Sequence, residues 1–104
     1  MSVVDRAHLE QQTMGDRQLQ QEVLGLLAGQ LRSVCQHMVL ASPQERARLA
    51  HGLKGAALGV GAFALAQCAD AVEQEPDVKR HLHQLEQAAD TFLNFLPQLT
   101  WGVE

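Results

Sequence analysis

A histidine and a lysine lie three positions apart in a glycine-rich stretch, and this pair of side chains could carry out phosphoryl chemistry. The stretch AHGLKGAALGVGA covers residues 50–62 and holds His51, Lys54 and four glycines. Neutral imidazole is a nitrogen nucleophile near neutral pH, and a nearby ammonium can stabilise the oxygens of a phosphoryl group during transfer. Glycine inside a helix costs about 1 kcal/mol relative to alanine, so the glycines at positions 52, 55 and 59 require a reason other than helix formation.

The position of His51 on a helix predicts that its ring faces solvent. At about 100° per residue, four apolar residues collect on one side of the helix and His51 lies nearly opposite them. Lys54 and Arg48 lie about one turn away and could supply positive charge, while Gly55 leaves the surface bare for another protein to approach. The four inward residues are Leu49, Leu53, Ala56 and Val60. The predicted docking face consists of Gln44, Ala47, Arg48, Gly55 and Leu58.

Helix caps and breakers divide the rest of the chain. Asp16 suits the N-cap of a long helix that ends near residue 40. Ser42, Pro43 and Glu45 combine a capping box with proline at the first helical position, which predicts another helix that runs to about residue 60. A short helix precedes Asp16, a fourth ends at the break of residues 75–77, and the last stops at Pro97.

Apolar residues recur at spacings of three and four and mark the predicted core face of each helix. In the long helix they are Leu19, Val23, Leu26, Leu27, Leu31, Val34 and Met38; after residue 62 they are Leu65, Cys68, Ala69, Val72, Val78, Leu82, Leu85, Ala89, Phe92 and Leu96. Short connections between such helices predict an all-α fold, an antiparallel up-and-down four-helix bundle with a short additional N-terminal helix, in which residues 1–104 form one domain. We expect Trp101 to cover one end of this bundle.

The composition limits the partners of the chain. Its 104 residues carry a formal net charge of -4 with a pI near 5.7, and no basic cluster indicates nucleic acid or an anionic membrane surface. The N-terminus has no signal pattern and no apolar run is long enough to span a bilayer. These features, with an initiating methionine, predict a free-standing cytoplasmic monomer. Cys35 and Cys68 lie on predicted inward faces and are expected to pack as buried, reduced thiols.

If phosphoryl transfer occurs at His51, the chain is expected to act as a phosphocarrier rather than an enzyme. It contains no glycine-rich loop after a strand, no phosphate-binding loop and no acidic pair suited to magnesium. His81 and His83 point about 200° apart on a helix, so they are expected to face solvent and not to form a metal pair. We therefore expect no metal, no cofactor and no autokinase activity in this chain. The phosphoryl group and any Mg²⁺ would come from a partner.

The residues around His51 resemble the signature of histidine-containing phosphotransfer (HPt) domains of bacterial two-component phosphorelays. The signature residues present are His51, Leu53, Lys54, Gly55, Gly61 and Ala62. Gly15, Asp16 and Leu19 resemble the start of the first long helix of that family, and Leu65, Cys68, Val72 and Glu73 resemble its third. The resemblance thus covers about residues 5–96.

This resemblance implies a fold, a reaction and partners. It implies a single HPt domain over residues 1–104, phosphorylated on Nε2 of His51 and exchanging the phosphoryl group reversibly with receiver-domain aspartates. Lys54 would stabilise the phosphoryl group and Gly55 would permit close approach. The partners would be response-regulator receiver domains, which bring Mg²⁺, and a hybrid sensor histidine kinase, all met in transient complexes. In this family a polar residue from another helix often holds the second imidazole nitrogen, and Gln67 and Gln36 are the candidates.

Some residues depart from the family pattern, and other functions remain open. Ala56 and Ala57 stand where many members have small polar residues, and the motif gives Gly59 no role. One alternative is a non-catalytic helical-bundle module that docks a signalling partner without accepting phosphate. Another is a metal or redox protein that uses the five histidines and two cysteines.

Overall fold

The computed structural model of the chain describes residues 3–98 and contains only helices within them. This confirms the all-helical class, whereas the expected position of Trp101 lies outside the described residues. Caps at the predicted positions explain where two of the helices begin. The elements are α1 (Arg6–Gln12), α2 (Arg17–Met38), α3 (Pro43–Val60), α4 (Phe63–Gln74), α5 (Lys79–Phe95) and a 3₁₀ turn, η1 (Leu96–Gln98).

The N-caps of α2 and α3 are those predicted from the sequence. The Asp16 carboxylate accepts a hydrogen bond from the backbone N–H of Leu19 at 3.1 Å. Ser42 Oγ accepts one from the N–H of Glu45 at 3.2 Å, and Pro43 is the first residue of α3. Each cap satisfies a backbone donor that has no partner within its helix. At the other end of the chain, Pro97 does not follow the last helix directly but lies within η1.

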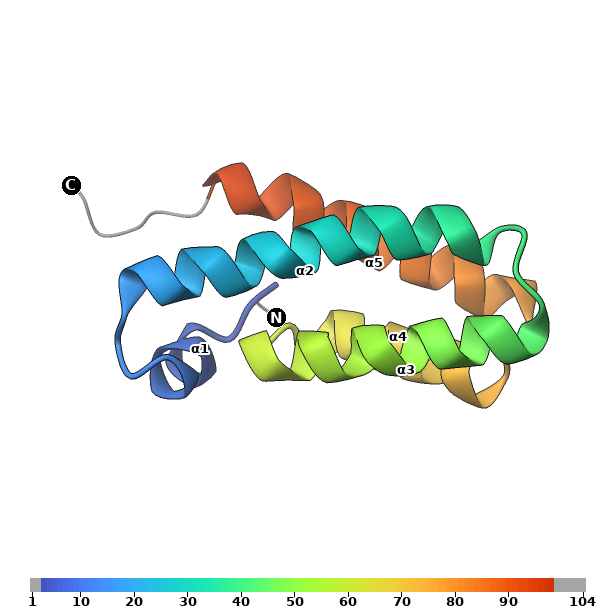
Figure 1. Ribbon diagram of the computed structural model, residues 1–104, viewed down its shortest axis with the longest axis horizontal. Helices are drawn as coiled ribbons and strands as arrows, with labels where there is room; N and C mark the ends of the chain where they lie inside the picture. The colour runs from blue at the N-terminus through green and yellow to red at the C-terminus, as the bar shows by residue number, and fades with distance from the viewer. Residues whose placement is uncertain (1–2, 99–104) are drawn as a thin grey trace.

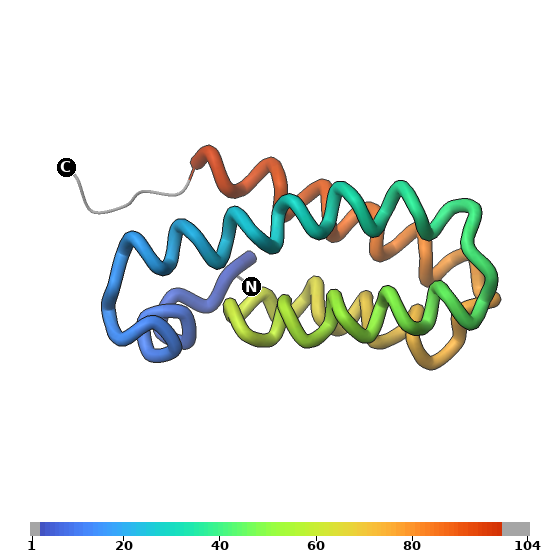
Figure 2. The backbone as a smooth tube through the Cα atoms, in the orientation of Figure 1, coloured from blue at the N-terminus to red at the C-terminus, as the bar shows by residue number. Residues whose placement is uncertain are grey.

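The helices α2, α3, α4 and α5 lie side by side along the length of the molecule, and α1 lies at one end of them (Figures 1 and 2). Successive helices pack on each other from α2 to α5, and α2 also contacts α5. In addition, α1 contacts α3. Among residues 3–98, none of the helices is both long enough and apolar enough to cross a membrane.

The core face of α2 differs from the predicted stripe. Leu27, Leu31 and Met38 are buried as predicted, but Leu19 is 37% exposed and Leu26 is 73% exposed. The reason is the rotation of the helix. Its buried line passes through Leu24, and Leu26 lies about 200° further around the helix. The sequence stripe was therefore wider than the surface that the neighbouring helices cover.

The inward face of α3 is the predicted one, turned slightly toward α4. Leu53 and Val60 are buried as predicted. Leu49 and Ala56 are only partly buried, and the fully buried alanines are Ala50 and Ala57. Of all its neighbours, α3 has its most extensive contact with α4. The buried face of α3 is consequently rotated from the predicted one toward Ala50 and Ala57, which pack against α4.

A left-handed glycine joins α3 to α4. Gly61 has φ 82°, ends α3, and its carbonyl accepts a hydrogen bond from the N–H of Asp5 at 2.8 Å. A Cβ at this position would lie 2.9 Å from the carbonyl oxygen of Asp5. Both the backbone conformation and the space therefore require glycine. This residue fixes the sharp reversal after which α4 returns along α3.

Replacing Gly61 tests this account of the turn. Gly61→Ala should lower the free energy of unfolding by about 1–3 kcal/mol, because a left-handed alanine is strained and its methyl group would meet Asp5. Gly25→Ala is the matched control, since Gly25 lies within α2 and its added Cβ would meet no atom within 4 Å. That substitution should stabilise by up to about 1 kcal/mol. Urea unfolding followed by circular dichroism measures both. Equal effects of the two substitutions would contradict the strained-turn account.

Candidate functional site

His51 projects from α3 into solvent, and a carboxylate from α4 holds one of its ring nitrogens. The side chain is 69% exposed, which confirms the predicted orientation. Its Nδ1 lies 2.8 Å from Oε2 of Glu73. An ionised carboxylate can only accept a hydrogen bond, so Nδ1 must carry the proton and donate it. The lone pair of the neutral ring is then on Nε2, which has no hydrogen-bond partner in the part of the chain that the structure describes.

Small residues between α3 and α4 allow these two side chains to meet. Ala50 and Ala57 of α3 and Ala66 and Ala69 of α4 are buried, with at most 3% of their surface exposed. Alanine at a helix contact lets the two backbones come close together. Glu73 lies 22 residues after His51, and the reversal at Gly61 brings it back alongside. The contact between His51 and Glu73 thus depends on the close packing of two helices.

Lys54 is held by two carboxylates of α4. Its Nζ lies 2.8 Å from Oε1 of Glu73 and 3.1 Å from Oδ1 of Asp70. Glu73 therefore bridges the ammonium group and the imidazole, one carboxylate oxygen to each. The contact with the Lys54 ammonium lowers the pKa of Glu73, and His51 lowers it further, which keeps the carboxylate ionised. The same contacts raise the pKa of Lys54, and Lys54 lowers the pKa of Asp70.

Glu73, and not a glutamine, is the residue that orients the ring, so the two candidates from the sequence were wrong. Gln67 lies beside Lys54 in a pocket between α3 and α4, and Gln36 lies on α2 in a groove shared with α5. A signal for Glu73 was present in the sequence. Two pairs, His51 with Glu73 and Lys54 with Asp70, have the same midpoint in the sequence, which is Ala62. Residues equally distant from a tight helical turn face each other across it.

The predicted docking face around His51 is mostly accessible. Leu58 is 44% exposed, Gln44 and Gly55 are exposed, and a Cβ at Gly55 would meet nothing within 4 Å. Ala47 is half-buried. Arg48 is exposed but forms an ion pair with Glu45 of its own helix, so its charge is largely offset. Of the two cations expected to supply positive charge beside His51, Lys54 therefore fits that role better than Arg48.

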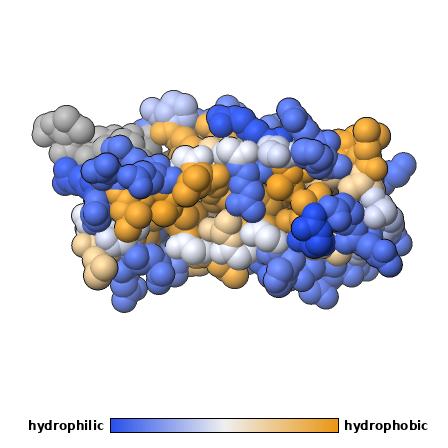
Figure 3. All heavy atoms as spheres, viewed as in Figure 1, coloured by the Kyte–Doolittle hydropathy of each residue, from blue (hydrophilic) through white to orange (hydrophobic). Residues whose placement is uncertain are grey.

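An apolar groove on the α2–α3 side extends this face. Figure 3 shows apolar surface gathered along the seam between these two helices. The groove has a volume of about 430 Å³, and Leu19, Leu26, Ala56 and Gly59 are among the residues that line it. A Cβ at Gly59 would meet nothing within 4 Å. Leu19 and Leu26, which were wrongly assigned to the core, therefore belong to an exposed surface. Gly59, to which the motif gave no role, places no side chain on that surface.

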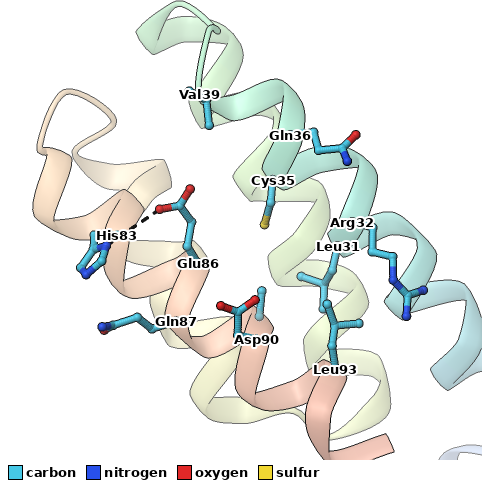
Figure 4. Close-up of a pocket in the computed structure, with 11 residues that line it drawn as sticks. Leu31, Arg32, Cys35, Gln36, Val39, His83, Glu86, Gln87, Asp90 and Leu93 are labelled. Atoms are coloured by element: carbon cyan, nitrogen blue, oxygen red, sulfur yellow. Dashed lines mark ion pairs between the residues drawn. The ribbon is translucent and has the colours of Figure 1, made fainter.

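Another groove, between α2 and α5, lies away from His51. It measures about 560 Å³ and is lined by residues of α2 and α5 together with Val39, which directly follows α2 (Figure 4). The Cys35 thiol points into it, facing Glu86 and Asp90 of α5 (Figure 4). Burial, with those two carboxylates, raises the pKa of this thiol, and burial raises that of Cys68. Both cysteines are only partly buried, but their thiols are protonated and poorly reactive at neutral pH.

The remaining histidines of the last helix differ from each other. His83 is exposed, as predicted. His81 was expected to face solvent, but its side chain is only 14% exposed and its Nε2 lies 2.8 Å from Oε1 of Glu75. Packing of α5 against the end of α4 accounts for this difference. No group of three or more potential metal ligands of the types His, Cys, Asp and Glu occurs among residues 3–98.

Comparison with protein-family models, curated proteins and solved structures gives no match for this chain. The resemblance of the residues around His51 to HPt domains therefore remains a prediction.

Removing the lysine should change the titration of its carboxylate partners. In Lys54→Met, the pKa of both Glu73 and Asp70 should rise, because the hydrogen bond that lowers each is lost. In the wild type, the pKa of each carboxyl group is lower in the folded than in the unfolded chain, where that of Glu73 would be near 4.5. The ion pairs therefore stabilise the fold fully above the unfolded pKa. This stabilisation is lost as the pH falls through the folded pKa. Carbon NMR of the side-chain carboxyl groups between pH 2 and pH 7 measures these midpoints. Unchanged midpoints in Lys54→Met would contradict the bridged arrangement.

Proposed function

We propose that the chain is a phosphorelay intermediate of the HPt type. In this proposal, Nε2 of His51 accepts a phosphoryl group from a receiver-domain aspartate and passes it to a second receiver. The observation that carries the proposal is the Glu73 carboxylate, which holds Nδ1 of an exposed histidine at 2.8 Å and Lys54 at the same distance. We further propose that α2 to α5 form the antiparallel up-and-down four-helix bundle of that family.

The transfer begins with the neutral ring of His51. Its Nε2 lone pair attacks the phosphorus of the aspartyl phosphate in line, so that a P–N bond forms as the P–O bond to the aspartate breaks. The aspartate leaves as a carboxylate. No proton needs to leave Nε2, because the hydrogen bond to Glu73 keeps the ring proton on Nδ1. The reverse sequence, with a second receiver, releases the phosphoryl group.

The charges around the ring suit this reaction. As the P–N bond forms, the imidazole gains positive charge, which its Nδ1–H shares with the Glu73 carboxylate. The Lys54 ammonium lies on the other oxygen of that carboxylate and can donate to the phosphoryl oxygens. A receiver would bring its own Mg²⁺. This chain then needs to supply only a nucleophile, an orienting carboxylate and one cation.

Receiver docking on the face around His51 is supported by the shape and polarity of that surface. Gly55 and Gly59 leave two places on α3 without a side chain, and Leu26 and Leu58 offer exposed apolar area on either side. A partner backbone can approach such a surface closely. Together with Gln44, Ala47 and Arg48, these residues form the docking surface that we assign to receiver domains.

The wider assignment follows from this role. We propose that the upstream donor is the receiver of a hybrid sensor histidine kinase, that the chain acts in the cytoplasm as a monomer, and that its complexes are transient. It would act as a carrier without autokinase activity. The competing assignment is a docking module that binds a receiver without accepting phosphate. The same exposed apolar groove would support that module, so the two assignments differ only in the chemistry of His51.

Labelling of His51 tests the proposal directly. A receiver domain carrying radioactive phosphoryl groups should transfer an acid-labile, alkali-stable label to the wild type and to His83→Ala, but not to His51→Ala. His83 is the matched control because it is also an exposed histidine. Binding of each variant to the receiver is measured in parallel. Binding without any label on the wild type would support the docking module and contradict the phosphocarrier.

Substitutions beside the ring should separate chemistry from docking. Lys54→Ala should slow transfer by roughly 10- to 100-fold, because a donor to the developing phosphoryl charge is lost. Gly55→Leu should instead weaken receiver binding, since its side chain occupies the open surface beside His51. Rapid-quench kinetics at several receiver concentrations measures both effects. Unchanged transfer in both variants would refute the assigned site.

A further inference from the structure

Asp70 is a charged residue of the site that has no role in the phosphoryl transfer described above. It lies on α4, one turn before Glu73, and its Oδ1 is 3.1 Å from Nζ of Lys54. Unlike Glu73, it forms no hydrogen bond to His51 within the described residues. Its side chain is 48% exposed, whereas that of Glu73 is 22% exposed. Among the charged groups of the described site, Asp70 therefore pairs with Lys54 but not with His51, and Gln74 of its own helix also donates to its carboxylate.

The charge balance around Lys54 is negative before any phosphoryl group arrives. One ammonium group faces two carboxylates, Asp70 and Glu73. Arg48 does not correct this balance, because Glu45 already pairs with it. A phosphoryl group on Nε2 adds roughly 1.5 to 2 further negative charges near neutral pH. The phosphorylated ring therefore needs the ammonium of Lys54 at the moment when two other anions already hold it.

Of the two carboxylates, Asp70 is the one that can give way. Glu73 holds both Nδ1 of His51 and Lys54, so its displacement would also release the ring. Asp70 holds Lys54 but not the ring, and water and the Gln74 side chain can solvate its exposed carboxylate when the contact with Lys54 breaks. An ammonium group has three donors, and the donor that points to Asp70 is the one that can be redirected at the least cost.

We propose that Asp70 competes with the phosphoryl group on His51 for Lys54 and thereby makes the phosphorylated state less stable. This inference rests on the proposed function and concerns its regulation. The competition weakens the hold of Lys54 on the phosphoryl oxygens, and the uncompensated carboxylate repels them. Asp70 therefore sets how readily the phosphoryl group leaves His51. It is a positioning residue, since it acts through Lys54 and does not touch the reacting atoms.

The test uses phosphoramidate as a donor, so that no receiver is needed. Nε2 of His51 attacks the phosphorus of phosphoramidate, the P–N bond of the donor breaks, and protonated nitrogen leaves as ammonia. With phosphoramidate and ammonium at a fixed ratio, phosphorus NMR gives the equilibrium occupancy of His51. Label on the other four histidines is subtracted with a His51→Ala sample.

The expected results form a matched set. Asp70→Asn should raise the equilibrium constant for phosphorylation by roughly two- to five-fold, the size expected for one exposed charge contact. Asp70→Glu keeps the charge and should remain close to the wild type. Asp90→Asn removes one carboxylate from the exposed surface of α5, outside this site, and should also leave the constant unchanged. The increase in Asp70→Asn should shrink at high salt, because screening weakens an exposed charge contact.

Failure of this inference is distinct from failure of the proposed function. An equal constant for the wild type and Asp70→Asn, or the same rise in Asp90→Asn, would overturn the role of Asp70 while His51 remained a phosphoacceptor. Labelling by phosphoramidate without any transfer from a receiver would instead overturn the phosphorelay assignment. A wild type that phosphoramidate cannot label at His51 would overturn both.

Discussion

The candidate site depends on one interaction, the carboxylate of Glu73 placed between the imidazole of His51 and the ammonium of Lys54. An anion in this position fixes the proton of the ring on Nδ1, since a carboxylate only accepts hydrogen bonds. The Lys54 ammonium on its other oxygen keeps Glu73 ionised. Glu73 in turn keeps the ring proton of His51 on Nδ1. The exposed Nε2 carries the lone pair of the ring as a result of this arrangement, although it has no hydrogen-bond partner of its own within residues 3–98.

The fold supplies this interaction through close packing of α3 and α4. Four buried alanines let the helices approach, and Gly61 turns the chain back sharply enough for α4 to follow α3. The glycines on the outer side of α3 act differently. Gly55 and Gly59 have open space around them and place no side chain on the outer surface of α3. One helix thus uses small residues on two sides, for packing on the inner side and for access on the outer side.

Much of this structure could be predicted from the sequence, because the relevant signals are local. The caps at Asp16 and Ser42 and the solvent-facing position of His51 follow from side-chain chemistry and helical period, and the structure confirms them. What could not be read locally was the rotation of α2, which depends on how its neighbours cover it and which exposes Leu26. The partner of Nδ1 was also missed, because it is the register of α4 against α3 that brings Glu73, rather than Gln67 or Gln36, to the ring.

The reversal at Gly61 has a consequence for how such a site can change in evolution. The histidine, the lysine and both carboxylates all belong to one helical hairpin, residues 43–74, and the two cross-helix pairs share a centre at Ala62. A single inserted residue between the turn and Asp70 would rotate both carboxylates away together, by about 100°. The length of the connection is thus under the same constraint as the residues of the candidate site. The helices outside the hairpin can diverge in sequence much further, provided that they still cover its apolar side.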